Sequence, residues 1–388
     1  MTLFVLALGC FGLFTSTVFA AMVLAGTRHY LQAAGRSEDD GGFTPPLSLL
    51  KPLHGDEPGL ETNLTTFFEQ DYPAYEILFC AKDRDDAGLA VARRVASRYP
   101  RIPTRFFSTN ELRYINAKVQ SMELMAASAS HSILVISDSD VRVTAGYLRA
   151  VAAPFRDAKV GGMTCLYRGV AAEGGLWARL EAIGMSVEMT AGVLVANSIE
   201  GMKFVLGPTM AFRSEVIREM GGFGVTADYC ADDFVLGNET DKLGWKVALS
   251  HHVIDHMVLN SSFVSSIEHQ IRWMKSTRFS RPKGHFGTAL TFAMPFGLIA
   301  ALGAVGLGHP ILGAVLIGWS LVTRFAIAWA AGWLVVGDRN WLELFLLYPV
   351  RDLMGFFFWA SSYTSDRVHW RGRVFRLSPG GKMHSTDD

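Results

Sequence analysis

The sequence lacks the features that mark several large classes of protein. Its 36 basic and 36 acidic residues cancel, so no excess of positive charge favours nucleic-acid binding. Only four cysteines occur among 388 residues, and none belongs to a Cys-x-x-Cys motif or to a metal-ligand spacing. This argues against a disulfide framework and a cysteine-bound zinc site, and favours free thiols in a reducing compartment or in lipid. The sequence has no internal repeat and no low-complexity tract.

Long apolar segments are present instead, because half of all residues are hydrophobic. Residues 3–26 carry no charge and would span about 36 Å as a helix, more than a bilayer core of roughly 30 Å. A cleaved signal peptide is the alternative, with a passable cleavage site at residues 18–20. No basic residue precedes the apolar run, whereas Arg28 follows it. This asymmetry favours an uncleaved anchor at residues 1–30, with the next part of the chain in the cytoplasm.

Apolar segments return in the last quarter of the chain. Residues 287–308 predict one membrane span, and residues 310–336 predict another that is interrupted by a single arginine. Residues 341–363 are also apolar, but Arg351 and Asp352 lie near their middle. Charges at membrane depth are costly unless they are buried in protein or lie at an interface.

The last apolar segment raises a question of topology. A third full crossing would place the arginine-rich tail, residues 366–388, outside, although positive segments prefer the cytoplasm. Either residues 341–363 are re-entrant or lie in the membrane plane, or residues 310–336 form a tight hairpin. We therefore assign residues 286–365 to a transmembrane or re-entrant region, and the tail to the cytoplasm.

Between the apolar ends, residues 44–260 alternate short apolar runs with amphipathic stretches. Apolar runs that begin near Leu47, Tyr75, Thr104 and Ser132 predict strands, each separated from the next by a predicted helix. This alternation predicts an α/β domain with a Rossmann-like, mostly parallel sheet. Ligands of such sheets bind beyond the carboxyl ends of the strands, and the acidic residues cluster there.

Asp138 and Asp140 directly follow the fourth predicted strand. Two carboxylates one residue apart can hold a hard divalent cation through oxygen ligands. Such a cation neutralises the charge that develops on a departing diphosphate. An ordinary acidic loop is the alternative, and the buried strand before it favours the metal site. His251, His252 and His256 fit a loop or packing better than a second metal site.

Two other acidic groups are candidates for substrate contacts. Asp83, Asp85 and Asp86 end the second predicted strand, where a carboxylate can accept hydrogen bonds from a nucleotide base or ribose. A solvated turn has the same composition. Asp232 and Asp233 precede an apolar helical run, so the pair is a candidate helix N-cap. The functional alternative is a general base that takes the proton of an acceptor hydroxyl.

Basic residues in two places are candidates for phosphate binding. Asn116 and Lys118 open a predicted helix, where a lysine can meet a phosphate, although a surface lysine is commoner. Residues 261–285 predict a basic amphipathic helix at the membrane surface. Arg272 and Trp273 of this helix can cap a nucleotide and its diphosphate, and binding of lipid headgroups alone is the alternative.

The order and spacing of these motifs resemble the ceramide glucosyltransferase family, including its bacterial, hopanoid-associated relatives. The likeness covers nearly the whole chain and is carried by the segments LLKPLHG, INAKVQ, ISDSDVRV, GPTMAFRSEV, ADDFVLG, IRWMKS and HWRGRVFRL. It implies a GT-A fold, a UDP-sugar donor, a Mg²⁺ or Mn²⁺ cofactor, and inversion at the anomeric carbon.

Carried over by position, the resemblance gives roles to single residues. Asp86, with Asp83 beside it, matches the aspartate that contacts the nucleotide. Asp138 matches the aspartate of the metal motif. Asp233 matches the proposed catalytic base, which Asp232 supports.

The family's nucleotide-binding motif ends in an Arg-Trp pair, which falls on Arg272 and Trp273. Two departures from the family pattern stand out. The motif begins with Gln or Arg, but here that position is His269, which can donate a hydrogen bond and whose charge depends on pH. Asp140 completes a full Asp-x-Asp, which some ceramide enzymes lack. This second departure supports a metal site and favours the bacterial branch of the family.

The sequence therefore predicts a multi-pass membrane enzyme, an inverting glycosyltransferase. It would transfer glucose or N-acetylglucosamine from a UDP-sugar to the hydroxyl of a ceramide-type or hopanoid-type lipid. Its catalytic domain would be cytoplasmic, at the inner membrane if the cell is bacterial. One alternative is a processive polysaccharide synthase of the cellulose or hyaluronan kind. The other is a non-catalytic membrane protein that binds a nucleotide or a lipid.

Overall fold

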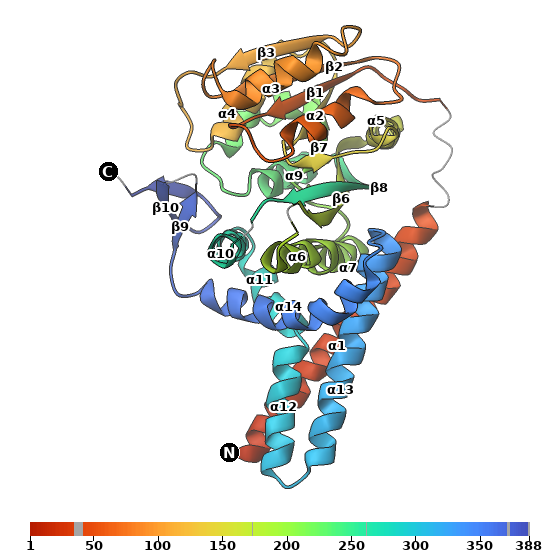
Figure 1. The fold of residues 1–388 in the computed structure, drawn as a ribbon, viewed down its shortest axis with the longest axis vertical. Helices are drawn as coiled ribbons and strands as arrows, with labels where there is room; N and C mark the ends of the chain where they lie inside the picture. The colour runs from red at the N-terminus through yellow and green to blue at the C-terminus, as the bar shows by residue number, and fades with distance from the viewer. Residues whose placement is uncertain (35–41, 173, 261, 371–372, 387–388) are drawn as a thin grey trace. The chain divides into compact units, whose positions relative to one another are not determined.

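The computed structural model describes residues 1–388 except 35–41, 173, 261, 371–372 and 387–388 (Figure 1). Internal contacts divide the chain into two units, each built from segments that are distant in sequence. The first unit comprises Met1–Ala33, Glu173–Ile199 and Asn260–Gly381. The second unit comprises Ala34–Ala172, Glu200–Leu259 and Lys382–Asp388.

An eight-stranded sheet forms the centre of the second unit, in the order β3-β2-β1-β4-β7-β6-β8-β5. Strands β1 to β4 are the four that the sequence predicts, and they pair in parallel with one another. β7 is antiparallel to both of its neighbours, while β6 and β8 are again parallel. The predicted α/β fold is confirmed, with a mixed sheet. The strands are β1 (Leu47–Pro52), β2 (Tyr75–Ala81), β3 (Thr104–Ser108), β4 (Ile133–Ser137), β5 (Val141–Arg142), β6 (Val160–Ala171), β7 (Thr209–Arg213) and β8 (Lys246–Val258).

Helices connect these strands and cover the sheet, as Figure 1 shows for the upper part of the chain. Strands β1, β2 and β4 are buried almost throughout, which explains why most of their residues are apolar. Helix α3 buries Leu89, Ala92 and Val95 at helical spacing. The helices of this unit are α2 (Leu60–Phe68), α3 (Ala87–Ala96), α4 (Ala117–Ser128), α5 (Tyr147–Ala152), α8 (Ser214–Glu219) and α9 (Asp232–Lys242).

Three helices of the first unit, α1 (Thr2–Ala34), α12 (Met294–Gly306) and α13 (Pro310–Ile327), run side by side (Figure 1). Glycines set their spacing, because a Cβ atom on Gly9 would overlap Ala300 and one on Gly303 would overlap Leu6. Small residues at such contacts let helix backbones approach closely, as they do between membrane helices.

Among the described residues, three helices are long and apolar enough to cross a membrane: Thr2–Ala34, Leu176–Glu200 and Pro310–Val335. A bent pair, Pro282–Thr291 with Met294–Gly306, would make a fourth span. This pair bends by 50°, so a span at the predicted residues 287–308 would be a broken one. The tight hairpin considered for 310–336 is wrong, since α13 continues into the π-helical η5 (Ala328–Val335).

The apolar helix at 176–200 was not singled out in the sequence analysis. It consists of α6 (Leu176–Ile183), the π-helical η2 (Gly184–Met189) and α7 (Thr190–Glu200). It packs against α14 (Trp341–Ser361), which lies across one end of the α12 and α13 pair in Figure 1. Helix α14 contains Pro349 and is not among the candidate spans.

Buried ion pairs account for the charges inside α14. Asp352 Oδ1 accepts a 2.6 Å hydrogen bond from Arg324 of α13, and both side chains are almost completely buried. Asp352 Oδ2 accepts from the backbone N–H groups of Ala293 and Met294, at 3.0 and 2.8 Å. Arg351 pairs with Glu188 at 2.8 Å. The two charges are therefore buried in protein, as their depth requires.

The predicted amphipathic helix at 261–285 consists of two helices in the described residues. Helix α10 (Phe263–Ser280) ends before Pro282, which begins α11 (Pro282–Thr288). The buried side chains of α10 are Ser266, Gln270 and Ser276. The most buried side of α10 is therefore polar rather than apolar. The antiparallel strands β9 (Arg367–Trp370) and β10 (Arg373–Leu377) belong to the predicted tail, and its residues 371–372 and 387–388 lie outside the described part.

Candidate active site

Asp138 and Asp140 lie directly after β4, at the carboxyl end of a strand in the middle of the sheet. The Asp138 carboxylate forms an ion pair with Lys118 at 2.6 Å and remains partly exposed. Asp140 Oδ2 lies 3.2 Å from His256 Nε2, while Asp140 Oδ1 is buried without a hydrogen-bond partner among the described residues. Burial disfavours the charge of Asp140, but His256 outweighs it and holds the pKa of Asp140 below its usual range.

Lys51 of β1 stabilises the backbone of this acidic turn. Its fully buried ammonium donates to the Asp138 carbonyl at 2.6 Å and lies 3.7 Å from the centre of the Phe67 ring. Burial lowers the pKa of Lys51 to about 7, although Asp138 and Asp140 oppose the shift. Lys51 thus fixes the backbone carbonyl of the first of the two acidic residues.

Asn116 and Lys118 begin helix α4, as the sequence predicts. Asn116 is the N-cap: its Oδ1 accepts from the Lys118 N–H at 3.0 Å, and its Nδ2 donates to the Tyr229 carbonyl at 3.1 Å. Because Asn116 is fully buried and both of its amide atoms are used, it holds the start of the helix in place. Burial disfavours the charge of Lys118, but the nearby Asp138 and Asp232 outweigh it and raise the pKa of Lys118.

Asp232 and Asp233 occupy the first turn of α9, where Ala231 is the N-cap. The interpretation of the pair as an N-cap is therefore wrong. Asp233 Oδ2 accepts from the Gly207 N–H at 2.8 Å, and Oδ1 accepts from the Phe234 N–H at 2.7 Å. Burial and the adjacent Asp232 raise the pKa of Asp233 to about 6, against the pull of Lys118. Burial also raises the pKa of Asp232.

Gly207 brings these two acidic groups to one place. A Cβ atom added there would lie 3.2 Å from Asp233 Oδ2 and 3.8 Å from Asp138 Oδ2. Both oxygens therefore border the same small space above the glycine. A carboxylate with a raised pKa lies there beside a carboxylate of the candidate metal pair, and a larger residue at position 207 would intrude on both.

Asp83 and Asp86 lie at the end of β2. Asp86 is the N-cap of α3, and its carboxylate accepts from the N–H groups of Gly88 and Gly55, at 2.8 and 3.0 Å. Asp83 is exposed, and its carbonyl accepts from the Asp86 N–H at 3.2 Å. The loop before α2 joins Asp86 to the acidic turn, since Gly55 contacts Asp86 and Glu57 accepts a 2.5 Å hydrogen bond from Ser139.

His269 and Trp273 belong to the first unit, where α10 places their rings 4.3 Å apart. The buried Glu181 accepts a 2.7 Å hydrogen bond from His269 Nδ1 and one of 2.6 Å from Ser266. Arg272 follows on the same helix and is partly buried. Glu181 thus fixes the histidine ring at the position where the sequence departs from the family motif.

Several residues of the acidic site escaped the sequence analysis. Lys51 and Glu57 had been assigned no role, and His256 was assigned with His251 and His252 to a loop or to packing. All three histidines lie within β8, so the loop interpretation is wrong. Among the described residues, no three His, Cys, Asp or Glu side chains are grouped as ligands of one metal ion.

Two known proteins from one organism are similar to this chain in sequence. The chain is 27% identical to ceramide glucosyltransferase 3 of Caenorhabditis elegans over 351 residues, which cover 87% of this chain and 74% of the relative. It is 24% identical to ceramide glucosyltransferase 1 of the same organism, over 97% of this chain and 81% of the relative.

A solved structure shares the fold. It is a mannosyltransferase from Pyrobaculum calidifontis in complex with GDP-Man and Mn²⁺, which matches with a TM-score of 0.50 and 17% identity over 87% of this chain and 99% of that one. This likeness shows a GT-A type of fold for the chain. The family model of glycosyl transferase family 21 matches residues 11–383, which is nearly the whole chain. The chain belongs to glycosyl transferase family 21.

Proposed function

We propose that this glycosyltransferase is metal-dependent and transfers one sugar, glucose or N-acetylglucosamine, from a UDP-sugar to the hydroxyl of a ceramide-type or hopanoid-type lipid, with inversion. The observation that carries the proposal is the space above Gly207, which Asp233 and Asp138 both border. A displacement at a sugar carbon needs a base at the attacking oxygen and stabilisation of charge at the leaving oxygen. Asp233 would be the base, and Asp138 would hold the cation that stabilises the leaving oxygen. The names of the curated relatives support the lipid acceptor.

Asp138 and Asp140 would hold Mg²⁺ or Mn²⁺. The buried, unpartnered Oδ1 of Asp140 and the partly exposed carboxylate of Asp138 fit a hard cation that prefers oxygen ligands. When bound, the metal ion would neutralise charge on the departing diphosphate. Lys51 fixes the turn that carries both ligands.

Asp233 would act as the general base. Its pKa of about 6 leaves it deprotonated at neutral pH, yet basic enough to accept a proton from a hydroxyl in the transition state. The acceptor oxygen attacks the anomeric carbon, its proton passes to the Asp233 carboxylate, and the bond from that carbon to the UDP oxygen breaks. A single displacement of this kind inverts the anomeric carbon. Asp232 acts through Asp233, because its charge raises the pKa of the base.

The remaining candidate residues would bind the donor. Lys118, which Asn116 positions at the start of α4, would place its charge near the diphosphate. Asp86 and Asp83 would contact the nucleotide, as the family resemblance implies. A role in binding the nucleotide and its diphosphate is likewise proposed for the nucleotide-binding motif of α10, which comprises His269, Arg272 and Trp273.

We also propose that the unit with the sheet lies in the cytoplasm, at the inner membrane if the cell is bacterial. Arg28 follows the uncharged part of α1, and positive flanks favour the cytoplasm. Helix α14 would lie near the membrane plane, which leaves the arginine-rich tail on the same side. A reporter fused after residue 388 should be active only in the cytoplasm, and a periplasmic signal would contradict this topology.

A direct test uses the purified full-length protein in detergent with Mg²⁺ or Mn²⁺. UDP-glucose and UDP-N-acetylglucosamine are each offered with ceramide, bacteriohopanetetrol or diacylglycerol, and products are identified by mass spectrometry. We expect one lipid carrying a single sugar, and no product in EDTA. A growing polymer would instead indicate a polysaccharide synthase, and UDP binding without turnover of any donor would indicate a binding protein.

The role of Asp233 has its own test. Asp233→Asn should lower turnover by about 10²-fold to 10⁴-fold, the contribution typical of a general base, while UDP binding is retained. Asp241→Asn is the matched control, because it removes an exposed carboxylate from the same helix. Normal turnover by Asp233→Asn would refute the assignment.

A further inference from the structure

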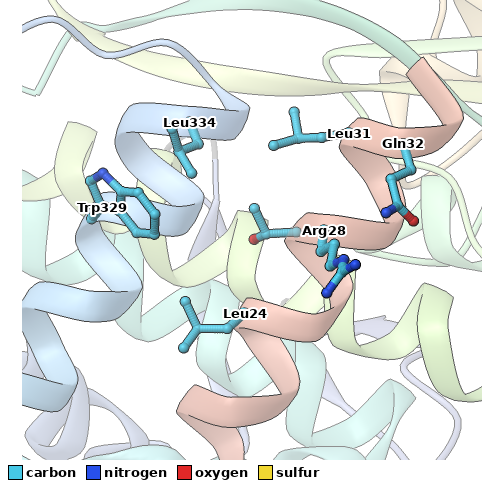
Figure 2. A pocket seen from close by; sticks show the side chains of 7 residues that line it. Leu24, Arg28, Leu31, Gln32, Trp329 and Leu334 are labelled. Atoms are coloured by element: carbon cyan, nitrogen blue, oxygen red, sulfur yellow. The ribbon is translucent and has the colours of Figure 1, made fainter. Parts of the chain in front are cut away.

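A recess on the first unit lies between the second half of α1 and the π-helical η5 that ends the α13 helix (Figure 2). Its volume is about 380 Å³, which is within the range of small-ligand sites. The residues that line it are Leu24, Thr27, Arg28, Leu31 and Gln32 from α1, and Trp329 and Leu334 from η5.

The length of α1 places this recess at the level of lipid headgroups. Its 33 residues extend about 50 Å as a helix, whereas a hydrocarbon core is roughly 30 Å thick. The apolar run ends at residue 26, so Thr27 and Arg28 are the first residues beyond it. Trp329 is 48% exposed in the opposite wall, and tryptophan is enriched where membrane helices leave the hydrocarbon.

The recess combines apolar walls with a buried hydroxyl that has no partner and an exposed arginine. Leu24 and Trp329 present exposed apolar surface to it. Within the described part of the chain, Thr27 Oγ1 is buried and has no hydrogen-bond partner. Arg28 forms no ion pair and no hydrogen bond with any described residue, and no acidic side chain lines the recess. A ligand that fits these walls therefore has an acyl chain and an anionic, hydrogen-bond-accepting head.

We propose that the recess binds one phospholipid with an anionic headgroup, at a site separate from the acidic site of the sheet. The guanidinium of Arg28 pairs with the lipid phosphate, since arginine binds phosphate oxygens with two parallel hydrogen bonds. The Thr27 hydroxyl donates to a phosphate or glycerol oxygen, and Gln32 contacts the polar end. The acyl chain lies along Leu24 and Trp329. The proposal does not depend on which reaction the enzyme catalyses.

The test measures thermal unfolding of the full-length protein in detergent by tryptophan fluorescence. Phosphatidylglycerol, phosphatidylcholine and inorganic phosphate are titrated separately. We expect phosphatidylglycerol to raise the Tm in a saturable way, phosphatidylcholine to need a higher concentration, and inorganic phosphate to have no effect. A basic residue near a charged lipid surface contributes enough for Arg28→Gln to raise the half-saturating concentration about fivefold.

Two further variants keep this test specific. Arg101→Gln removes an exposed positive charge from the loop between α3 and β3 and should titrate like the wild type. Thr27→Val keeps the shape of the side chain, removes only the hydroxyl, and should also weaken the effect of the lipid. The proposal is overturned if the Arg28→Gln titration superimposes on the wild type. It is also overturned if phosphatidylcholine matches phosphatidylglycerol, or if inorganic phosphate gives the same shift.

Discussion

Replacing Asp233 by asparagine should stabilise the metal-free protein while it removes the activity. The pKa of Asp233 is raised from 3.8 to about 6, and this difference corresponds to about 3 kcal/mol of unfolding free energy. Asparagine has one acceptor oxygen, whereas the carboxylate accepts from both Gly207 and Phe234. Loss of one of these hydrogen bonds costs about 1 kcal/mol. The expected net gain at pH 7.5 is therefore about 2 kcal/mol.

The stability gained by Asp233→Asn should increase as the pH rises. Between pH 3.8 and about 6, folded Asp233 keeps a proton that the unfolded chain has lost. Stability of the wild type therefore falls as the pH rises through this window, and the penalty is complete above about pH 6. Asparagine does not titrate, so its advantage grows over the same window and then stays constant.

The assay follows thermal unfolding in detergent and EDTA by tryptophan fluorescence, with one heating rate for all samples. Wild type, Asp233→Asn and the Asp241→Asn control are compared at pH 4.5 and pH 7.5. We expect a higher Tm for Asp233→Asn at pH 7.5 and little or no advantage at pH 4.5. An Asp233→Asn protein that is no more stable than the wild type at pH 7.5, or equally favoured at both pH values, would refute the reasoning.

Three further changes probe the site and the apolar unit. Asp138→Asn or Asp140→Asn should each raise the Mn²⁺ concentration for half-maximal turnover at least tenfold, and unchanged metal titrations would exclude both as ligands. Gly207→Ala should lower kcat about tenfold or more because its methyl group lies 3.2 Å from the Asp233 oxygen, and wild-type kcat would contradict the shared space. Asp352→Asn should lower the unfolding free energy by about 3–5 kcal/mol, since the Arg324 charge stays buried without its partner, and an unchanged Tm in detergent would contradict this.

The sheet could be predicted because its signals are local. Strands β1, β2 and β4 are mostly apolar runs, and the helices that follow β2 and β3 each begin at a polar cap residue. Asp86 and Asn116 are such caps, so the residues that begin α3 and α4 were found together with the strands. Strand order was not available in this way, and β7, β6 and β8 reverse and restore the direction of the sheet through pairings far apart in sequence.

The supporting residues of the site could not be predicted for the same reason. Lys51 contacts Asp138 across 87 positions of sequence, and His256 contacts Asp140 across 116. A lysine within an apolar strand has no local feature that identifies its partner. It becomes meaningful only when β1 and β4 are known to be neighbours, because the ammonium then lies below the turn after β4.

The N-cap interpretation of Asp232 and Asp233 was wrong because the sequence does not show which way a carboxylate points. An aspartate before an apolar run is a good cap when its carboxylate turns back to its own helix. Here Asp233 also accepts from the Gly207 N–H, 26 positions earlier, and Ala231 takes the cap position. The family resemblance, which places the base at Asp233, used the spacing of several motifs and was not affected by this local ambiguity.

The charged residue Asp352 of α14 has partners in α12 and α13 that could not be predicted from the sequence. Helix α12 begins at Met294 after a sharp bend, so its first N–H groups have no partner within the helix. Asp352 accepts from two of these groups, and its other oxygen pairs with Arg324, which also donates to the carbonyl of Thr291 before the bend. In a low-dielectric surrounding the backbone groups at such a bend need polar partners, because each unsatisfied group costs several kcal/mol. Asp352 and Arg324 are these partners. Asp352, one of the two charged residues that make 341–363 a poor membrane span, therefore stabilises the broken helix beside it, whereas Arg351 pairs with Glu188.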